Sequence, residues 1–294
     1  MSEVKVVPDG NFVGGWIREE VSEKDYTTDH PAVRPILDKT TFKSRASPGV
    51  DLRSKMPPIY DQGQLGSCVS NGCNALLAFL VYAVLGKFID FSRLWTYFVG
   101  RNMMGSQYVS QDSGLEIRNG MGALAEAGAP TEKVWPYTIS QFTKEPGFLA
   151  KATARSWIPL TYWRLDPAGT KPADVLAAIK ATLSSGLPVV FGFNCYESLQ
   201  AANTTKTGII PFPKPTEKLI GGHCIVAVGY DDTTQMLLIR NSWGLSWGIK
   251  GYGWLPYDYV LKKASQDTDP SVQTEASDFW TAGKAAAVEP NQFL

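Results

Sequence analysis

The chain has 294 residues, of which 44% are hydrophobic and 12% aromatic, enough to bury the core of one large domain or two small ones. Basic and acidic residues both number 28, so the formal net charge is zero and gives no reason to expect nucleic acid or an anionic membrane as partner. The four cysteines form no pair or Cys/His cluster with zinc-ligand spacing, which argues against a metal site.

The sequence predicts no export signal and no membrane anchor. Met1 to Glu20 contains no apolar core behind a basic start, so it does not resemble a secretory signal. The longest apolar run, Ala75 to Leu85, is far shorter than the roughly 20 residues that a membrane-spanning helix needs. The compartment stays open between the cytoplasm and export by a non-classical route.

The two ends of the chain look like appendages. Residues 1–46 are polar and weakly periodic, with three prolines and an acidic stretch, and predict extended structure rather than stable helices. Within this part, Gly14-Gly15-Trp16 suits a tight bend followed by an apolar anchor. Residues 281–294 predict a loose tail.

The first part of the central region, about residues 50–155, predicts mostly helices. A strongly apolar helix begins near Cys68 and ends at Gly86, a usual C-terminal stop. Another helical pattern covers residues 115–126 and ends at Gly128.

The second part, about residues 156–280, predicts mostly sheet. It contains one helical pattern, at residues 172–184. Glycine, proline and asparagine separate the strand-like runs at 188–193, 223–230 and 236–240.

Cys68 is the cysteine best placed for chemistry. At a helix start, the positive end of the helix dipole favours a thiolate over a thiol. A cysteine beside an apolar helix is nevertheless more often a small buried hydrophobic residue, and this is the role expected for Cys73, Cys195 and Cys224.

A thiol nucleophile needs a histidine to take and return its proton, and the chain has only His30 and His223. His30 lies in the polar N-terminal part, whereas His223 opens an apolar strand after two glycines. Asn241 follows 18 residues later, a spacing that lets a hairpin return its amide oxygen to the imidazole, with Trp243 covering the hydrogen bond. Taken alone, each of these residues also fits a purely structural role.

Three segments in this order resemble the signature segments of papain-like cysteine peptidases. They are Gln62-Gly63-Gln64-Leu65-Gly66-Ser67-Cys68, Gly222-His223 and Asn241-Ser242-Trp243-Gly244. The interval from Cys68 to His223, 155 residues, is close to the roughly 130–150 residues typical of the family.

The resemblance implies an α+β fold with a helical half, a sheet-rich, barrel-like half and the active-site cleft between them. The peptidase domain would span residues 47–280. It also implies hydrolysis of peptides or proteins through a Cys68 thioester, with His223 as general base and acid, Asn241 orienting the histidine, and no cofactor. Residues 1–46 would be a short inhibitory propeptide lying across the cleft; the alternatives are a disordered leader and a strand that only completes the sheet.

The resemblance also assigns residues around the reacting atoms. Gln62 would supply the side-chain donor of the oxyanion hole, a role for which Gln64 is the rival. Substrate would be bound by residues from both halves: Gly66, Ser67, Gly114, Leu115, Gly192, Gly222, Cys224 and Trp243. Among these, Leu115, Gly192, Gly222 and Cys224, with Gly221, would form an uncharged pocket for the second residue before the scissile bond, favouring Leu, Val or Phe over Asp or Lys.

The chain departs from the family pattern at the cysteine pair of its secreted members. Leu65 replaces one cysteine, Val69 replaces the aromatic residue after the nucleophile, and Asp112-Ser113-Gly114 replaces the segment with the partner cysteine. These features resemble a bacterial branch with short N-terminal extensions. Two alternatives are a catalytically inactive binding protein on the same fold and a Cys-His acyltransferase with a carboxylate third member, against which Asn241 and Gln62 argue.

Overall fold

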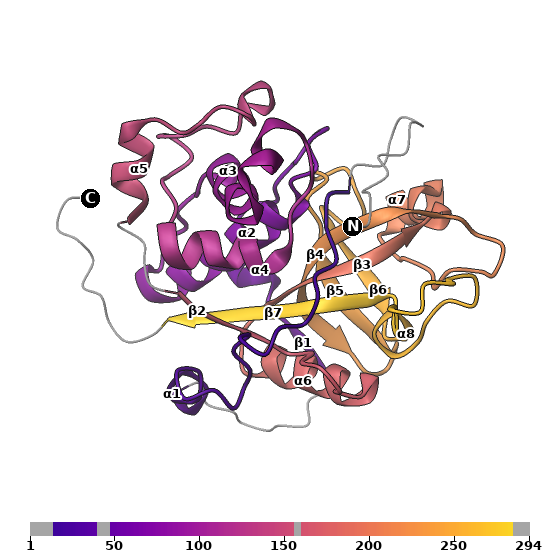
Figure 1. Cartoon of the computed structure of the whole chain (residues 1–294). Coiled ribbons are helices and arrows are strands. Elements are labelled where there is room, and N and C mark those ends of the chain that lie inside the picture. The colour runs from indigo at the N-terminus through magenta and orange to yellow at the C-terminus, as the bar shows by residue number, and fades with distance from the viewer. Residues whose placement is uncertain (1–13, 40–47, 156–159, 285–294) are drawn as a thin grey trace.

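The computed structural model describes residues 14–39, 48–155 and 160–284, with helices concentrated in the first part of the chain and strands in the second (Figure 1). The α-helices are α1 (Arg34–Lys39), α2 (Cys68–Leu85), α3 (Arg93–Met104), α4 (Ile117–Gly122), α5 (Phe148–Ala154), α6 (Pro172–Ser184), α7 (Ala202–Thr207) and α8 (Asp258–Leu261). The strands are β1 (Gly49–Asp51), β2 (Leu160–Arg164), β3 (Val189–Tyr196), β4 (Leu219–Asp231), β5 (Met236–Arg240), β6 (Tyr252–Pro256) and β7 (Ala276–Lys284). The fold is therefore α+β, as predicted.

Helix α2 is the central helix of the core. Its first twelve residues, Cys68 to Phe79, are all buried, and it packs on β4, β3 and β7. The helix ends at Gly86, whose φ of 66° is the left-handed conformation that glycine adopts most readily. Within the described residues, α2 alone has the length and apolar composition of a membrane span, but 67% of that stretch is buried inside the protein, as expected for a core helix.

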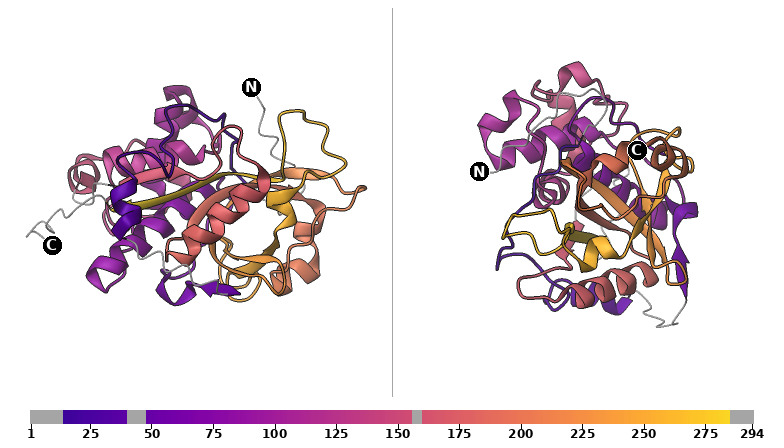
Figure 2. Two further views of the ribbon diagram at one scale, coloured as in Figure 1. Left: turned by 90° about the horizontal axis from the view of Figure 1, so that it is seen from below. Right: turned by 90° about the vertical axis from the view of Figure 1, so that its right-hand side faces the viewer.

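The sheet is open, so the barrel-like part of the prediction is wrong. Its antiparallel strands run in the order β2-β7-β3-β4-β5-β6, with β1 added to β4, and the edge strands β2 and β6 do not pair with each other. Helices α2 and α6 pack against the sheet, so the core lies between sheet and helices rather than inside a closed barrel. In both views of Figure 2, the helical half and the sheet-rich half remain distinct.

Several predicted elements coincide with the structure. Helix α6 and strand β5 have the predicted bounds, and the predicted helix 115–126 is α4 followed by a π-helical turn, Ala123–Ala127, that ends at Gly128. The prediction of a loose tail is wrong for residues 281–284, because β7 continues to Lys284 and pairs there with β2. Residues 285–294 lie outside the described part of the chain.

The described N-terminal segment, residues 14–39, runs along the junction of the two halves and ends in α1 near β7 and β2 (Figure 1). Trp16 forms an isolated parallel bridge with Leu115, as an extended path predicts. The helix α1 was not predicted; its buried side chain Ile36 packs against the main body at Gly283, and this tertiary contact stabilises a helix too short to form alone. Residues 1–13 and 40–47 of the predicted 1–46 appendage lie outside the described residues.

Candidate active site

Cys68 is the first residue of α2, and its side chain is completely buried. Burial raises the pKa of its thiol to about 12, while the backbone N–H groups of Val69 and Cys224 lower it by binding the sulfur. Because Cys224 directly follows His223 in β4, this contact brings the thiol next to the strand that carries the histidine.

His223 and Asn241 are joined through the β4–β5 hairpin. The register pairs Val226 with Arg240, so Asn241, the residue after β5, comes to the level of Ile225, two residues from His223, and the His223 and Asn241 side chains meet at 2.8 Å between Nε2 and Oδ1. An amide oxygen can only accept, so Nε2 carries the proton in this pair. Burial lowers the pKa of His223 to about 4, and the hydrogen bond that His223 donates to Asn241 opposes that change. In this structure the imidazole is therefore neutral near pH 7.

Trp243 covers the His223–Asn241 hydrogen bond. Its ring stacks on the imidazole with a centroid distance of 4.5 Å and an interplanar angle of 23°. Trp247 in turn meets the Trp243 ring edge-on at 5.7 Å. The two indoles keep water away from the pair and hold the plane of the imidazole.

Gln62 is completely buried, whereas Gln64 is exposed. The Gln62 side-chain oxygen accepts a hydrogen bond from Ser242 at 2.7 Å, so its NH₂ group turns the other way, where it donates to the carbonyl of Leu65 at 3.0 Å and to that of Gly14 at 3.4 Å. An amide donor is thus fixed close to the start of α2, and the hydrogen bond from Ser242 ties it to the loop that follows Asn241.

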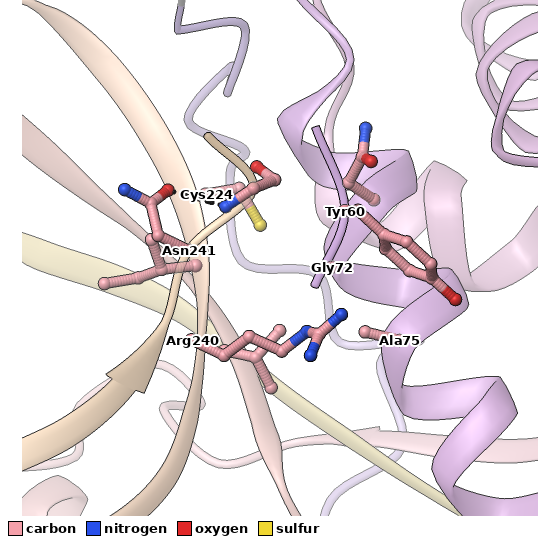
Figure 3. Close-up of a pocket in the computed structure, with 10 residues that line it drawn as sticks. Tyr60, Gly72, Ala75, Cys224, Arg240 and Asn241 are labelled. Atoms are coloured by element: carbon pink, nitrogen blue, oxygen red, sulfur yellow. Dashed lines mark hydrogen bonds between the residues drawn. The ribbon is translucent and has the colours of Figure 1, made fainter. Parts of the chain in front are cut away.

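Arg240 supports the loop that leads to Gln62 from behind the active site. It donates to the backbone carbonyls of Pro57 at 2.7 Å and Pro58, and its guanidinium lies over the ring of Tyr60. Figure 3 shows Arg240 and Tyr60 facing each other across a small cavity between α2 and the strands β4 and β5. Cys224 lines this cavity too, with its sulfur directed toward Gly72 of α2.

Comparison with known proteins places this geometry in a family. The sequence model described as papain family cysteine protease matches residues 46–268. An uncharacterized peptidase C1-like protein of Acanthamoeba polyphaga mimivirus is 33% identical over 277 residues, which cover 90% of this chain and 85% of the viral protein. The crystal structure of xylellain, a cysteine protease from Xylella fastidiosa, is 31% identical with a TM-score of 0.74, covering 93% of this chain and 97% of xylellain.

The chain belongs to the papain family of cysteine proteases. Chicken (Gallus gallus) cathepsin K is a more distant relative, 27% identical over 252 residues that cover 82% of this chain and 70% of the cathepsin. The family resemblance predicted from the three sequence segments is thereby confirmed, and the chain is a cysteine peptidase, a hydrolase of peptide bonds.

The N-terminal segment makes backbone hydrogen bonds with two of the residues predicted to bind substrate. Gly15 donates to the carbonyl of Gly222 at 3.1 Å and accepts from the N–H of Leu115 at 2.8 Å, and Ile17 donates to the carbonyl of Leu115 at 3.1 Å. A Cβ on Gly15 would lie 2.0 Å from the carbonyl oxygen of Gly66, so only glycine allows this close approach.

Trp16 fills a hollow lined by glycines that the sequence assigns to the substrate pocket. A Cβ on Gly192 would lie 1.9 Å from the indole ring, and one on Gly222 would lie 2.8 Å from it. The indole Nε1, which also lies close to Gly192, donates to Asp278 at 3.0 Å. Asp278 belongs to β7 and was not among the predicted pocket residues.

Buried charges hold the N-terminal segment beyond Trp16, and sequence reasoning missed them. This charged cluster consists of Glu19, Asp25, Arg118, Arg164, Asp166 and Asp278. Glu19 accepts from Arg164 at 3.1 Å and from the Trp280 indole at 2.6 Å, while Arg118 pairs with Asp25 at 2.7 Å. Burial and the neighbouring Asp278 raise the pKa of Glu19 to about 8, although both arginines oppose the rise.

The remaining predicted residues have local roles in this structure. Gly114, with a φ of 77°, packs against the carbonyl of Gly15, and Ser67 contacts the Tyr137 hydroxyl. His30 lies half-buried in the N-terminal segment, stacked on Tyr26. Among the described residues, no group of three His, Cys, Asp or Glu side chains is arranged to hold a metal ion.

Proposed function

We propose that Cys68 is the nucleophile of this cysteine peptidase and His223 its general base and acid. The observation that carries the assignment is the 2.8 Å hydrogen bond from His223 to Asn241 beneath Trp243, with Cys68 buried at the start of α2, the helix that packs on the strand β4 carrying His223. Hydrogen-bonded to Asn241 through Nε2, the imidazole directs Nδ1 to the proton of the thiol.

In the proposed reaction, His223 takes the thiol proton as the Cys68 sulfur attacks the substrate carbonyl. The imidazolium then protonates the leaving amine, and a water molecule, deprotonated by His223, hydrolyses the thioester. The Gln62 amide and the backbone N–H of Cys68 stabilise the oxyanion. The acyltransferase alternative requires a carboxylate where Asn241 lies, and the inactive alternative requires the loss of one of these side chains.

A dipeptidyl fluorogenic substrate, with a thiol-reactive inhibitor as control, tests this assignment. Cleavage should be blocked by alkylation of Cys68 and should disappear in Cys68→Ala. Unchanged cleavage by Cys68→Ala would refute the assignment.

We also propose that the N-terminal segment inhibits the enzyme by occupying the cleft. The supporting observations are the hydrogen bonds of Gly15 and Ile17 to Gly222 and Leu115, together with the Gly14 carbonyl that faces the Gln62 amide. A substrate needs the same backbone groups, so it cannot bind while the segment is docked.

The inhibition is tested with a chain that begins at Ser47 and with a peptide of residues 1–46. The shortened chain, checked for folding by circular dichroism, should cleave small substrates faster than the full chain, and the added peptide should inhibit it. A folded shortened chain with unchanged kinetics and no response to the peptide would rule out an inhibitory segment.

A further inference from the structure

We propose that Tyr137 is a positioning residue of the oxyanion hole, whose hydroxyl ties Gln62 to Ser67 and so fixes the separation of the two oxyanion donors. The inference rests on the proposed function, in which these donors are the Gln62 side-chain amide and the backbone N–H of Cys68. Its starting point is a pair of contacts made by one oxygen atom: the Tyr137 hydroxyl donates to the Gln62 carbonyl at 2.9 Å and also bonds to the Ser67 hydroxyl.

The hydrogen bonds of the Tyr137 hydroxyl have defined directions. The Gln62 carbonyl can only accept, so the phenol donates its single proton there and the Ser67 hydroxyl supplies the proton of the other bond. Asn71, in the first turn of α2, donates through its side-chain NH₂ group to the Ser67 hydroxyl at 3.2 Å. Burial raises the pKa of Tyr137 to about 12, so the phenol keeps its proton near pH 7. A directed chain of hydrogen bonds therefore runs from α2 to the Gln62 backbone.

The backbone N–H of Cys68 is aimed by the first turn of α2. This N–H belongs to the same peptide plane as the Ser67 carbonyl, so the groups that fix the carbonyl also fix the direction of the N–H. Three donors bind the carbonyl oxygen: the Asn71 backbone N–H at 3.0 Å, the Asn71 side-chain NH₂ at 2.9 Å and the Ser70 hydroxyl at 2.9 Å. The helix thus holds one end of the loop 62–68, and the Tyr137 hydroxyl relates the other end to it.

The aromatic ring of Tyr137 is itself held by a charged pair, Arg93 and Glu132. The guanidinium of Arg93, the first residue of α3, lies over two aromatic rings, 4.4 Å from the centroid of Tyr137 and 4.6 Å from that of Tyr60. Glu132 pairs with Arg93 at 3.5 Å and accepts the backbone N–H of Tyr137. Because both the ring and the backbone are fixed, the hydroxyl is in place before a substrate binds.

The position of the Gln62 amide matters for the rate because an oxyanion donor must lie where negative charge develops in the transition state. A misplacement of about 1 Å can cost on the order of 100-fold in rate. Loss of the Tyr137 hydroxyl alone leaves the ring and its charged pair in place, so the loop should shift by less than that. We therefore expect Tyr137→Phe to lower kcat about tenfold and to leave KM within about twofold of its original value.

The test compares Tyr137→Phe with the matched control Tyr259→Phe. Both substitutions remove a hydroxyl that donates to a backbone carbonyl; in the control, on α8, the acceptor is Pro211 at 3.0 Å. The parent for both is the full chain with Trp16→Ala, which under the proposed inhibition weakens docking of the N-terminal segment. The kcat and KM for one dipeptidyl fluorogenic substrate are measured together with the melting temperature. Both variants should lose similar thermal stability, but only Tyr137→Phe should lose kcat.

Two further readouts separate positioning of the oxyanion donors from general damage to the site. Iodoacetamide alkylates a thiol by displacing iodide, a reaction in which no oxyanion forms, so its rate on Cys68 should be the same in Tyr137→Phe and in the parent. In a chain that already carries Gln62→Ala, Tyr137→Phe should cost much less than tenfold in kcat, because one of the two donors that it aligns is gone.

A second variant, Ser67→Ala, covers the case in which Tyr137→Phe does not fold. It breaks the same bridge at its other end and leaves the phenol in place, so kcat should again fall severalfold while the rate of alkylation stays unchanged. An unchanged kcat in Ser67→Ala would show that the bridge does not position the donors.

The inference is overturned by an unchanged kcat in Tyr137→Phe, or by equal losses of kcat in Tyr137→Phe and Tyr259→Phe. It is also overturned if Tyr137→Phe costs the full tenfold in the chain that carries Gln62→Ala. A kcat that Gln62→Ala alone leaves unaffected refutes the proposed oxyanion donor instead, and the inference falls with it.

Discussion

The proposed catalytic group, Cys68, His223, Asn241 and Gln62, and the charged cluster are joined by Trp16, whose ring contacts Gly222 beside His223 and whose N–H reaches Asp278. They differ in their electrostatics. In the docked chain the catalytic group is neutral, because burial raises the thiol pKa and lowers the imidazole pKa. The charged cluster binds the segment through ion pairs instead. Under the two proposed functions, reactivity and access depend on separate side chains, so each should respond to its own substitutions.

The largest effect should come from the catalytic group. Cys68→Ala and His223→Ala should each lower kcat/KM by at least about 10⁴-fold, because nucleophilic attack and proton transfer have no substitute. Asn241→Ala should cost less, since Trp243 still holds the ring. Replacing the other cysteines by alanine is the control and should leave activity measurable: Cys73, Cys195 and Cys224. Equal, complete loss in Asn241→Ala and His223→Ala would contradict an orienting role for Asn241.

A smaller loss is expected at the oxyanion donor. Gln62→Ala should lower kcat by about 10²–10³-fold with little change in substrate binding, because the amide acts on charge that develops only in the transition state. Steady-state kinetics on one dipeptidyl substrate measures this. Gln64→Ala is the matched control, two residues away and exposed, and should behave like the unchanged chain. If Gln64→Ala had the larger effect, the assignment of the two glutamines would be reversed.

Substitution in the charged cluster should raise activity rather than lower it. Arg118→Ala removes the 2.7 Å ion pair with Asp25, which is 5% exposed, and should make the full chain about tenfold more active on small substrates by weakening docking of the segment. Arg34→Ala is the control, because its ion pair with Asp29 is exposed on both sides and lies within the segment. A drop in activity with Arg118→Ala would indicate that Arg118 supports the enzyme instead.

The smallest expected effect is a pH dependence of the inhibition. The pKa of Glu19 is raised from 4.5 to about 8 when the segment is docked, so docking binds a proton. Inhibition should therefore be complete at low pH and weaken as the pH rises through about 8. At each pH, the rate of the unchanged chain is divided by the rate of Arg118→Ala. This ratio removes the pH dependence of the catalytic group, which both chains share. The ratio should therefore fall as the pH decreases, and Glu19→Gln should flatten it; a ratio that falls with increasing pH would show the opposite linkage.

The difference between the catalytic group and the charged cluster also explains which parts of the site can be predicted from the sequence. The catalytic group lies in short motifs whose residue types and spacing indicate chemistry, and the β4–β5 hairpin predicted from the 18-residue interval does return Asn241 to His223. Helix α6 was predicted within its bounds because Pro172 stands at its start and one apolar face repeats along it.

The charged cluster could not be predicted, because its pairs join residues far apart in the chain: Arg164 contacts Glu19 across 145 positions and Asp278 across 114. No local pattern marks such partners. The pairing of β3 with β7 shifts register between Val190 and Gly192, and this irregularity interrupts the alternation that would identify β7, which explains why its end, residues 281–284, is predicted as tail.

The most direct test of this account measures how fast Cys68 is labelled by a dipeptidyl epoxide in the full chain and in full-length Trp16→Ala, with the labelled residue identified by mass spectrometry. If the segment covers a reactive Cys68, the label should be on Cys68 alone and should form faster in Trp16→Ala. Labelling of another cysteine would contradict the nucleophile assignment, and equal labelling rates on Cys68 would contradict inhibition by the segment.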